Sequence, residues 1–367
     1  MIYLDNAATT PPAREALARA ELLYSENFFN PSARYGGGFA VQTLLAAARQ
    51  SILAQVADIN KFELIFTSGG TESDNQAIFG SARRGNAVTT AGEHAAVERS
   101  FTELKNRGVE SRFAPVTRDG SVDVERLLSL VDEKTSLVSV VHVNNETGAI
   151  NDVAAIARLV KQKNPRTLFH ADGVQAFGKI PVRLTPEIDL YSISAHKVGG
   201  LKGTGALIKR KGFVLPPLIF GGGQENTLRS GTENVLGILD FAYAAEALTS
   251  VNANKTLCEL LWELLDKDVF VRISPTNGSP YILTVSAAGT RGEVVQRMLY
   301  DNGVCVGTGS ACSSKNRFSR VITACGHPEP VLDGVLRVSF SPSTTEEEVR
   351  IAAAKMNEAV RKFKDKV

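Results

Sequence analysis

Short apolar runs alternate with stretches of helical periodicity through the first 250 residues of the chain. The run 136–143 is rich in valine and leucine, as is typical of a strand buried on both faces. The stretch 39–57 instead carries its apolar residues at helical spacing. Apolar strands that alternate with helices indicate a mainly parallel sheet with helices on both faces. We therefore predict an α/β fold for this part of the chain.

The same pattern gives the expected elements of this large domain, which we place at 13–250. The expected strands are 62–67, 86–91, 112–116, 136–143, 167–171 and 189–193. The expected helices are 13–24, 39–57, one ending near 79, 97–106, 123–130, 153–163 and 236–248. Residues 216–234 are a long glycine-rich loop.

Beyond residue 250 the order of the elements changes. Expected helices and strands no longer alternate one by one, and the chain closes with a helix at 345–363. This order predicts a second, smaller α+β domain. We assign residues 1–12 and 251–367 to it.

The composition excludes several classes of protein. A chain of 367 residues, 43% of them hydrophobic, is long enough for two globular domains. Its net charge of +2 gives no reason to expect a nucleic-acid or membrane partner. The first residues do not have the pattern of a signal peptide, and no apolar run is long enough to span a bilayer. We therefore expect a cytoplasmic protein with reduced thiols and no metal site.

Five polar residues follow the expected strands at or just past their carboxyl ends: His94, Asn145, Asp172, Gln175 and Lys197. Ligands of such sheets bind at the carboxyl ends of the strands. Each residue alone has a structural explanation, such as a satisfied core histidine. Their shared position is harder to explain without a common ligand.

Lys197 stands between a short apolar strand and a turn with four glycines in seven residues. A lysine amine can form an imine with a carbonyl compound if its surroundings favour the neutral form. A solvated lysine in a surface turn is the alternative. A Walker A loop fits poorly, because there the lysine follows the glycines.

The strand 62–67 runs through Gly69 and Gly70 into a helix that begins near Thr71. Such a turn places free backbone N–H groups around an anion, and the threonine adds a hydroxyl. An ordinary strand–helix turn is the alternative.

Together these residues match the needs of pyridoxal 5'-phosphate. Lys197 supplies the amine, Asp172 a carboxylate for the protonated ring nitrogen, and Asn145 or Gln175 donors for the ring oxygen. His94 offers an aromatic cover. The expected phosphate site consists of Gly70, Thr71, Ser194 and His196.

The chain also resembles a known family, the NifS/IscS type of cysteine desulfurases among class V aminotransferase-like enzymes. The Gly309–Cys312 segment separates this type from aminotransferases of the class. The matching segments are Tyr3–Thr10, Thr67–Asn75, Asn144–Gly148, His170–Asp172, Ser194–Lys197, Gly221–Glu225, Arg229–Thr232, Gly309–Cys312 and Leu336–Ser339.

The resemblance implies a fold type I architecture with a seven-stranded sheet, and it implies the roles of the residues. Lys197 would bind the cofactor and move the α-proton, with His94 as a possible proton carrier. Arg337 would anchor the carboxylate of L-cysteine, with help from Asn30. Thr232 would reach the phosphate site of a neighbouring subunit, which implies a homodimer.

Cys312 would attack the substrate sulfur and become a persulfide, with L-alanine as the other product. It lies in a polar segment near Lys315 and Arg317, which favour a thiolate. The family further implies a sulfur-acceptor or scaffold protein, iron–sulfur cluster assembly or another sulfur-transfer pathway, and a transient contact of Cys312 with such a cluster. Cys305 and Cys325 sit in apolar patterns and Cys258 in a helix, as structural thiols do.

Three readings stay open at this point. The first is a cysteine desulfurase. The second is another enzyme on the same scaffold, a selenocysteine lyase or an aminotransferase. The third is a cofactor-binding partner protein without turnover, against which the presence of Lys197, Asp172 and Arg337 argues.

Overall fold

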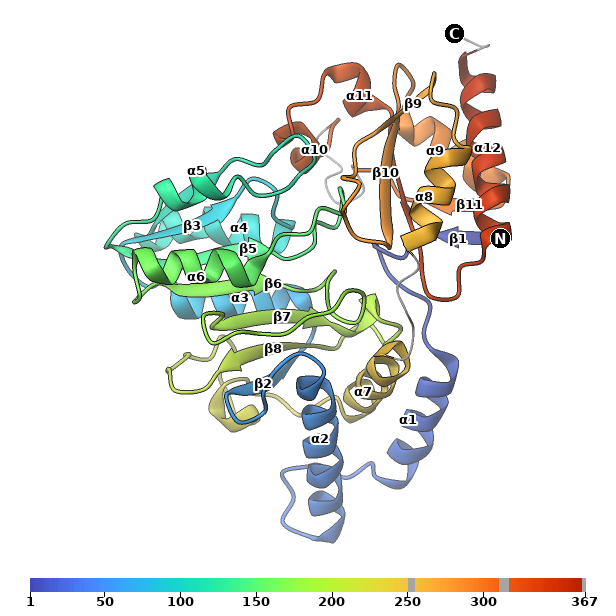
Figure 1. The fold of residues 1–367 in the computed structure, drawn as a ribbon. Coiled ribbons are helices and arrows are strands. Elements are labelled where there is room, and N and C mark those ends of the chain that lie inside the picture. Colours follow the sequence, from blue (N-terminus) through green and yellow to red (C-terminus); the bar gives the residue numbers. More distant parts are fainter. Residues whose placement is uncertain (250–254, 310–316, 365–367) are drawn as a thin grey trace.

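The computed structural model describes residues 1–249, 255–309 and 317–364 (Figure 1). Its main feature is a sheet with the strand order β2-β8-β7-β6-β5-β3-β4. Strand β8 is antiparallel to both of its neighbours, and the other pairs are parallel. The strands are β2 (Phe62–Thr67), β3 (Asn86–Thr90), β4 (Glu110–Ala114), β5 (Thr135–Val141), β6 (Leu168–Asp172), β7 (Leu190–Ser194) and β8 (Gly205–Arg210). The predicted α/β fold with a mainly parallel sheet is confirmed.

Helices cover both faces of this sheet, because alternate residues of each strand point to opposite faces. Val138 and Val140 of β5 belong to a core that α2, α5, α6 and α7 complete, whereas Leu137 packs with α3 and α4 on the other face. The helices of this domain are α1 (Arg14–Glu26), α2 (Gly36–Ala54), α3 (Gly70–Ser81), α4 (Ala95–Leu104), α5 (Val124–Ser129), α6 (Val153–Lys163) and α7 (Val235–Thr249).

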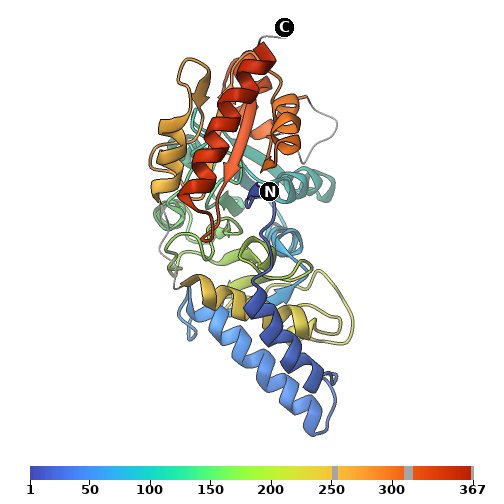
Figure 2. The same ribbon diagram turned by 90° about the vertical axis from the view of Figure 1, so that its right-hand side faces the viewer.

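Two local features differ from the expectation. Strand β8 was not expected, because only a short apolar run follows the glycines before three consecutive basic residues. Helix α2 begins at Gly36 rather than after the three glycines. A Cβ at Gly38 would lie 2.2 Å from the carbonyl oxygen of Ala33, so glycine lets the preceding loop approach the first turn. Figures 1 and 2 show α1 and α2 side by side at the end of the molecule away from the C-terminus.

The remaining elements pack around a second hydrophobic core. Strand β1 pairs with β11, and a separate antiparallel sheet has the order β12-β10-β9. Leu4 of β1 packs into the core formed by residues 257–360. We therefore propose the division into 13–250 on one side and 1–12 with 251–367 on the other. The elements are β1 (Ile2–Leu4), α8 (Lys255–Leu264), β9 (Phe270–Arg272), β10 (Ile282–Ala287), α9 (Gly292–Asp301), β11 (Val304–Val306), α10 (Arg320–Ala324), α11 (Glu329–Asp333), β12 (Val335–Ser339) and α12 (Glu346–Lys364).

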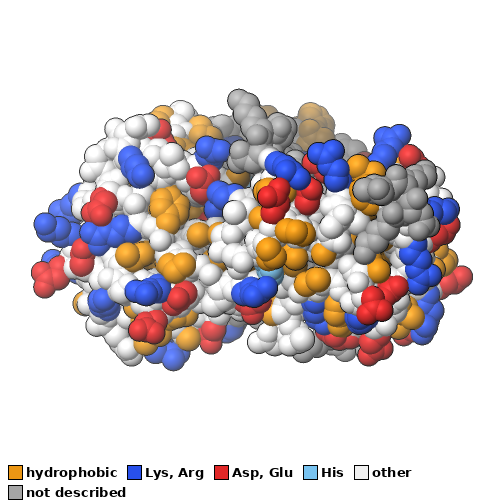
Figure 3. All heavy atoms as spheres, turned by 90° about the horizontal axis from the view of Figure 1, so that it is seen from above, with side chains coloured by type: hydrophobic (Ala, Val, Ile, Leu, Met, Phe, Trp, Pro, Cys, Tyr) orange, Lys and Arg blue, Asp and Glu red, His pale blue; other side chains and the backbone are white. Residues whose placement is uncertain are grey.

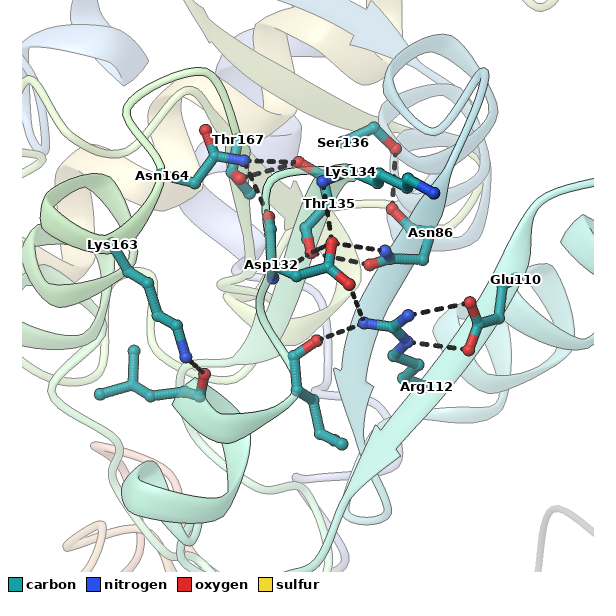
Figure 4. A network of polar contacts seen from close by, with 12 residues as sticks. Asn86, Glu110, Arg112, Asp132, Lys134, Thr135, Ser136, Lys163, Asn164 and Thr167 are labelled. Atoms are coloured by element: carbon teal, nitrogen blue, oxygen red, sulfur yellow. Dashed lines mark hydrogen bonds and ion pairs between the residues drawn. The ribbon is translucent and has the colours of Figure 1, made fainter.

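A polar network ties the amino ends of β3 and β5 together (Figure 4). Asn86 donates from Nδ2 to Asp132 Oδ1 at 2.9 Å and accepts from Thr135 Oγ1 at 2.7 Å. Arg112 of β4 donates to Asp132 Oδ2 at 2.7 Å, which lowers the pKa of that carboxyl. The network therefore fixes neighbouring strands at the edge opposite to their carboxyl ends.

The surface carries no large region of one charge sign in the view of Figure 3, where basic and acidic side chains are interspersed with apolar ones. In the described part of the chain, no helix has the length and apolar character that crossing a membrane requires.

Candidate active site

A cavity of about 260 Å³ lies at the carboxyl ends of the central strands, where the two domains meet. Ten of the residues predicted from the sequence line it. These are Gly70, Thr71, His94, Asn145, Asp172, Gln175, Ser194, His196, Lys197 and Arg337. The small domain contributes Arg337 from β12, together with Thr308 and Gly309.

Lys197 ends the short turn Ala195–Lys197 that follows β7. Its Nζ donates to the carbonyl oxygens of Ala7 and Ala8, at 2.7 Å each. These two carbonyls belong to the N-terminal segment, which passes over the cavity after β1. The amine is thereby held at the cavity wall by backbone acceptors.

Asp172 ends β6, and its carboxylate is buried with one hydrogen bond, from the backbone N–H of Val174 at 3.0 Å. Burial raises the pKa of Asp172, against the opposing influence of His94 and Lys197. A cation placed in the cavity beside it would favour the ionised form. The site therefore suits a ligand with a protonated ring nitrogen.

His94 stands at the N-cap of α4, where Nδ1 accepts from the backbone N–H of Ala96 at 3.1 Å. That bond assigns the ring proton to Nε2. Burial lowers the pKa of His94, and Lys197 lowers it further against the charge of Asp172. The imidazole is therefore neutral at pH 7 and free to present its face to a planar ligand.

The predicted phosphate site is formed between the start of α3 and the end of β7. A Cβ at Gly70 would lie 2.7 Å from Val174 Cγ2, so only glycine fits where the helix begins. The hydroxyl of Ser194 is buried without a hydrogen-bond partner. Burial lowers the pKa of His196 to about 4, and its Nδ1 lies 3.1 Å from Thr9 Oγ1. A helix start with an unpartnered hydroxyl is suited to an anion.

Arg337 is buried on β12, and its guanidinium is fixed from two sides. Nη1 donates to the carbonyl oxygen of Asn145 at 2.8 Å, and Nη2 pairs with Asp5 Oδ1 at 2.9 Å. Its Nε has no partner. A guanidinium held in this way can bind a carboxylate in one defined orientation.

Two predicted residues within the described ranges do not line this cavity. Asn30 and Thr232 lie together in a separate hollow of about 320 Å³, between the α1–α2 connection and the start of α7. Cys312 lies outside the described residues. The described chain stops at Gly309, which lines the cavity, and resumes at Arg317.

Sequence reasoning missed three acids at or beside the site. Asp74 and Glu146 line the cavity, Glu93 directly precedes His94, and Asp74 and Glu93 are buried. Burial raises the pKa of Glu93 to about 8 and also raises that of Asp74 and Glu146. Glu93 precedes His94 in the sequence, and Asp74 belongs to the glycine-rich segment. Their closeness in sequence to predicted site residues could therefore have identified them.

The donor set fits pyridoxal 5'-phosphate. An amine, a buried carboxylate, a neutral imidazole and an anion site with an unpartnered hydroxyl all face one cavity. Asn145 Oδ1 and Arg337 Nε are further polar atoms without partners there. These orphaned atoms indicate a polar ligand that the protein is built to surround.

Comparisons with known proteins agree with this site. The model of the family "Aminotransferase class-V" matches residues 2–351. "Cysteine desulfurase IscS" of Methanosarcina thermophila is 35% identical over 99% of this chain and 93% of its own length. A solved structure titled "NIFS-LIKE PROTEIN" is 36% identical with a TM-score of 0.91, covering 98% of this chain and 99% of its own. Another, "SspA in complex with cysteine", is 29% identical with a TM-score of 0.83, covering 94% and 100%.

The chain belongs to the class V aminotransferase family and, within it, to the cysteine desulfurases of the NifS/IscS type, which depend on pyridoxal 5'-phosphate.

Proposed function

We propose that this chain converts L-cysteine to L-alanine and captures the sulfur as a persulfide on Cys312. The observation that carries the proposal is the convergence of ten predicted residues on one cavity, with Thr308 and Gly309 at its wall. The described chain therefore stops at the site, three residues before Cys312. The related structure titled "SspA in complex with cysteine" supports the same substrate.

Pyridoxal 5'-phosphate, when bound, draws electrons away from the α-carbon of the substrate amino acid. Lys197 would hold its aldehyde carbon, and Asp172 would keep the ring nitrogen protonated. Gly70, Thr71, Ser194 and His196 would hold its phosphate. His94 would cover the ring. Because its imidazole is neutral, it would not repel the protonated ring nitrogen.

The residues of the chain also place and deprotonate the substrate. Arg337 would bind the α-carboxylate, because its guanidinium is fixed by Asn145 and Asp5 and faces the cavity. The Nζ of Lys197 would take the proton from the α-carbon of the substrate. Asn145 and Gln175 would hold the ring oxygen.

The sulfur transfer uses Cys312. Its thiolate attacks the substrate sulfur, a sulfur–sulfur bond forms, and the bond between that sulfur and the substrate β-carbon breaks. The electron pair of the broken bond stays on the β-carbon, which takes up a proton. The Nζ of Lys197 would return the proton to the α-carbon, and the product leaves as L-alanine. The persulfide then passes its outer sulfur to an acceptor, which we propose is a protein of an iron–sulfur cluster or other sulfur-transfer pathway.

The described cysteines are poor nucleophiles by comparison. Burial raises the pKa of Cys258 and of Cys325 to about 12, and it raises that of Cys305 as well. Cysteines with raised pKa values form little thiolate at neutral pH. None of the three is in a disulfide, which fits a reducing compartment, and we propose the cytoplasm.

We further propose a homodimer with shared sites. Asn30 and Thr232 lie in the hollow outside the cavity, and large apolar side chains are exposed around them. Examples are Phe28 at 65% and Tyr24 at 39% exposure. A second copy of the chain would cover these side chains and bring Thr232 to its neighbour's phosphate site.

The test is Cys312→Ala. We expect this variant to bind L-cysteine and to change the cofactor spectrum, but to form no persulfide. Its rate of sulfide release should fall by roughly two or more orders of magnitude, which is the usual effect of removing a covalent nucleophile. Mass spectrometry after one turnover should place one added sulfur on the Cys312 peptide of the parent.

Cys258→Ala, Cys305→Ala and Cys325→Ala are the matched controls and should keep their activity, with a packing cost of about 1 kcal/mol. Added sulfur on Cys305 or Cys325 would contradict the assignment. So would a Cys312→Ala variant that releases sulfide at the parental rate.

A further inference from the structure

One lysine next to the site has no role in the proposed mechanism. Lys179 follows β6 by seven residues and contacts Gln175, which lines the cavity. Its Nζ donates to Gln175 Oε1 at 2.7 Å. No carboxylate within the described ranges pairs with it, and burial together with Lys197 and Arg337 lowers the pKa of Lys179 to about 7. An unpaired lysine placed beside two other cations is costly, which calls for an explanation.

The hydrogen bonds of Gln175 assign the orientation of its amide. Its Nε2 donates to the carbonyl oxygen of Ala7 at 2.8 Å, and that carbonyl can only accept. The other end of the amide must then be the oxygen, which is the atom that Lys179 contacts. The amide nitrogen carries a second N–H group, and Gln175 lines the cavity. Gln175 therefore presents a donor to a ligand there.

We propose that Lys179 is a positioning residue, which holds the oxygen of the Gln175 amide away from the cavity so that the N–H group faces the ring oxygen of the cofactor. This inference rests on the proposed role of Gln175. Donation from a lysine also polarises the amide and makes its N–H a stronger donor. Without Lys179 the amide oxygen would be buried and unpaired, and the side chain would turn to find another partner.

The same carbonyl connects this arrangement to the reactive lysine. Ala7 accepts from both Gln175 Nε2 and Lys197 Nζ, so Lys179, Gln175, Ala7 and Lys197 form one chain of hydrogen bonds. Lys179 and Lys197 also line another cavity, of about 320 Å³, and Lys179 is not among the residues that line the active-site cavity. Lys179 acts from outside the reacting groups, and its substitution need not block the substrate.

The experiment measures the pH midpoint of the visible absorption change of the bound cofactor. A donor to the ring oxygen and a nearby positive charge both favour the deprotonated form of the cofactor–lysine linkage. Lys179→Met should therefore raise the midpoint by about one pH unit, and should weaken cofactor binding to the apoprotein several-fold. Lys179→Arg keeps both the donor and the charge, and should recover at least half of the shift.

A double-mutant cycle separates action through Gln175 from a through-space effect of charge. In a Gln175→Ala background, Lys179→Met should shift the midpoint by less than a third of its effect in the parent. An equal shift in both backgrounds, or no shift in either, would overturn the proposal. If Lys179→Met does not fold, the comparison of Lys179→Gln with Lys179→Ala replaces it. Lys179→Gln keeps a neutral donor, so it should shift the midpoint less than Lys179→Ala does.

Lys209→Met is the matched control. Lys209 is buried on β8 and pairs with Glu63, outside the cavity. Its loss should lower the melting temperature and leave the midpoint unchanged. The parent protein tests the proposed function separately: if it shows no visible cofactor band, or if borohydride does not fix the cofactor on Lys197, the site assignment fails. A normal band without any effect of Lys179→Met sinks only this inference.

Discussion

Glu93 shows how strongly the interior of this protein acts on a single ionisable residue. Its Oε1 accepts from Thr90 Oγ1 at 2.6 Å and from the backbone N–H of Val141 at 3.0 Å, whereas Oε2 is buried without a partner. Burial is the largest cause of its shift and raises the pKa of Glu93 to about 8, with the Asp172 carboxylate adding to it. The side chain is therefore protonated in the folded protein at neutral pH.

This shift predicts a pH dependence of stability. In the unfolded chain Glu93 loses its proton near its ordinary pKa of 4.5, whereas the folded protein keeps it until about 8. The folded state thus binds more protons in this window, and its stability falls as pH rises from about 5 to 8. Glu93→Gln should remove this fall, on the order of 3 kcal/mol, which thermal unfolding at several pH values measures.

Glu103→Gln is the control for that measurement, since Glu103 is exposed on α4, the helix that begins two residues after Glu93. It should leave the pH dependence as it is in the parent. A parental slope that persists in Glu93→Gln would show that another group dominates the pH dependence.

Gly307 is a second residue whose identity the site requires. A Cβ at this position would lie 2.6 Å from Asp5 Oδ1 and 3.0 Å from Arg337 Nη2. Gly307→Ala must therefore displace the ion pair that fixes the proposed substrate anchor. We expect KM for L-cysteine to rise about tenfold, because this is the effect of losing one charge-assisted hydrogen bond. The spectrum of the bound cofactor should remain unchanged.

Steady-state kinetics measures this effect, with Gly36→Ala as the matched control. A Cβ at Gly36 has no atom within 4 Å, so KM should not change. Loss of cofactor binding in Gly307→Ala, in place of a raised KM, would argue that Arg337 supports the fold rather than the substrate.

At the scale of elements, the two ends of the central strands have different tasks. Their carboxyl ends carry the cavity, and the amino ends of β3, β4 and β5 are joined by the network around Asp132 (Figure 4). Asn86 is 1% exposed and satisfies two members of that network. A hydrogen-bonded anchor at one end fixes the register of strands whose other end must hold catalytic side chains in place.

Asn86→Ala should therefore reduce stability without affecting the chemistry. Removing it leaves Thr135 Oγ1 and Asp132 Oδ1 each short of a buried partner, and we expect the free energy of unfolding to fall by about 2 kcal/mol. The activity per folded molecule should remain parental. Denaturant unfolding and an assay on the same sample check both statements.

Asn106→Ala provides the comparison, because Asn106 donates to Glu103 at 2.8 Å on the surface. It should change stability by less than about 0.5 kcal/mol. A loss of activity in Asn86→Ala at full folding would mean that the anchor and the cavity are coupled.

At the scale of the whole molecule, the loop that carries Thr232 is unusually constrained for a surface loop. Glu225, Asn226 and Thr227 have positive φ angles of 49°, 54° and 68°. Arg49 of α2 holds the turn in place, with bonds of 2.6 and 2.7 Å to the buried carboxylate of Glu225. Three consecutive left-handed residues are costly, and a structure keeps them only where the loop must have one shape. A contact with a second subunit would require that.

This arrangement predicts complementation between two defective variants. In a hybrid of Lys197→Ala and Thr232→Ala chains, one site is doubly defective and the other is intact. Random assembly then gives about a quarter of all sites in the intact form. Co-expression of the two variants should yield more sulfide release than either variant alone.

Lys197→Ala combined with Asp172→Ala is the control pair. Both residues line the same cavity of one chain, so no hybrid site is intact and no activity should return. A fully active monomer in sedimentation would contradict the shared site.

The sequence by itself determined the order of the elements and the chemistry of the site. Periodicity located the strands because burial on both faces requires apolar runs, and parallel strands bring their carboxyl ends to one edge. Lys197, Asp172 and His94 could be found there because each lies at the end of a strand or within four residues after it. Helix α2 and strand β8 were less well placed, since glycines and lysines mask their pattern.

Only the tertiary structure decided which groups hold these residues in place. Asp5 meets Arg337 and Ala7 meets Lys197 across most of the chain, through contacts that no local pattern encodes. Lys179 contacts Gln175 four residues away, yet its burial and its neighbouring cations come from other segments. Partners, desolvation and pKa values depend on what packs around a side chain, and that depends on the fold of the whole molecule.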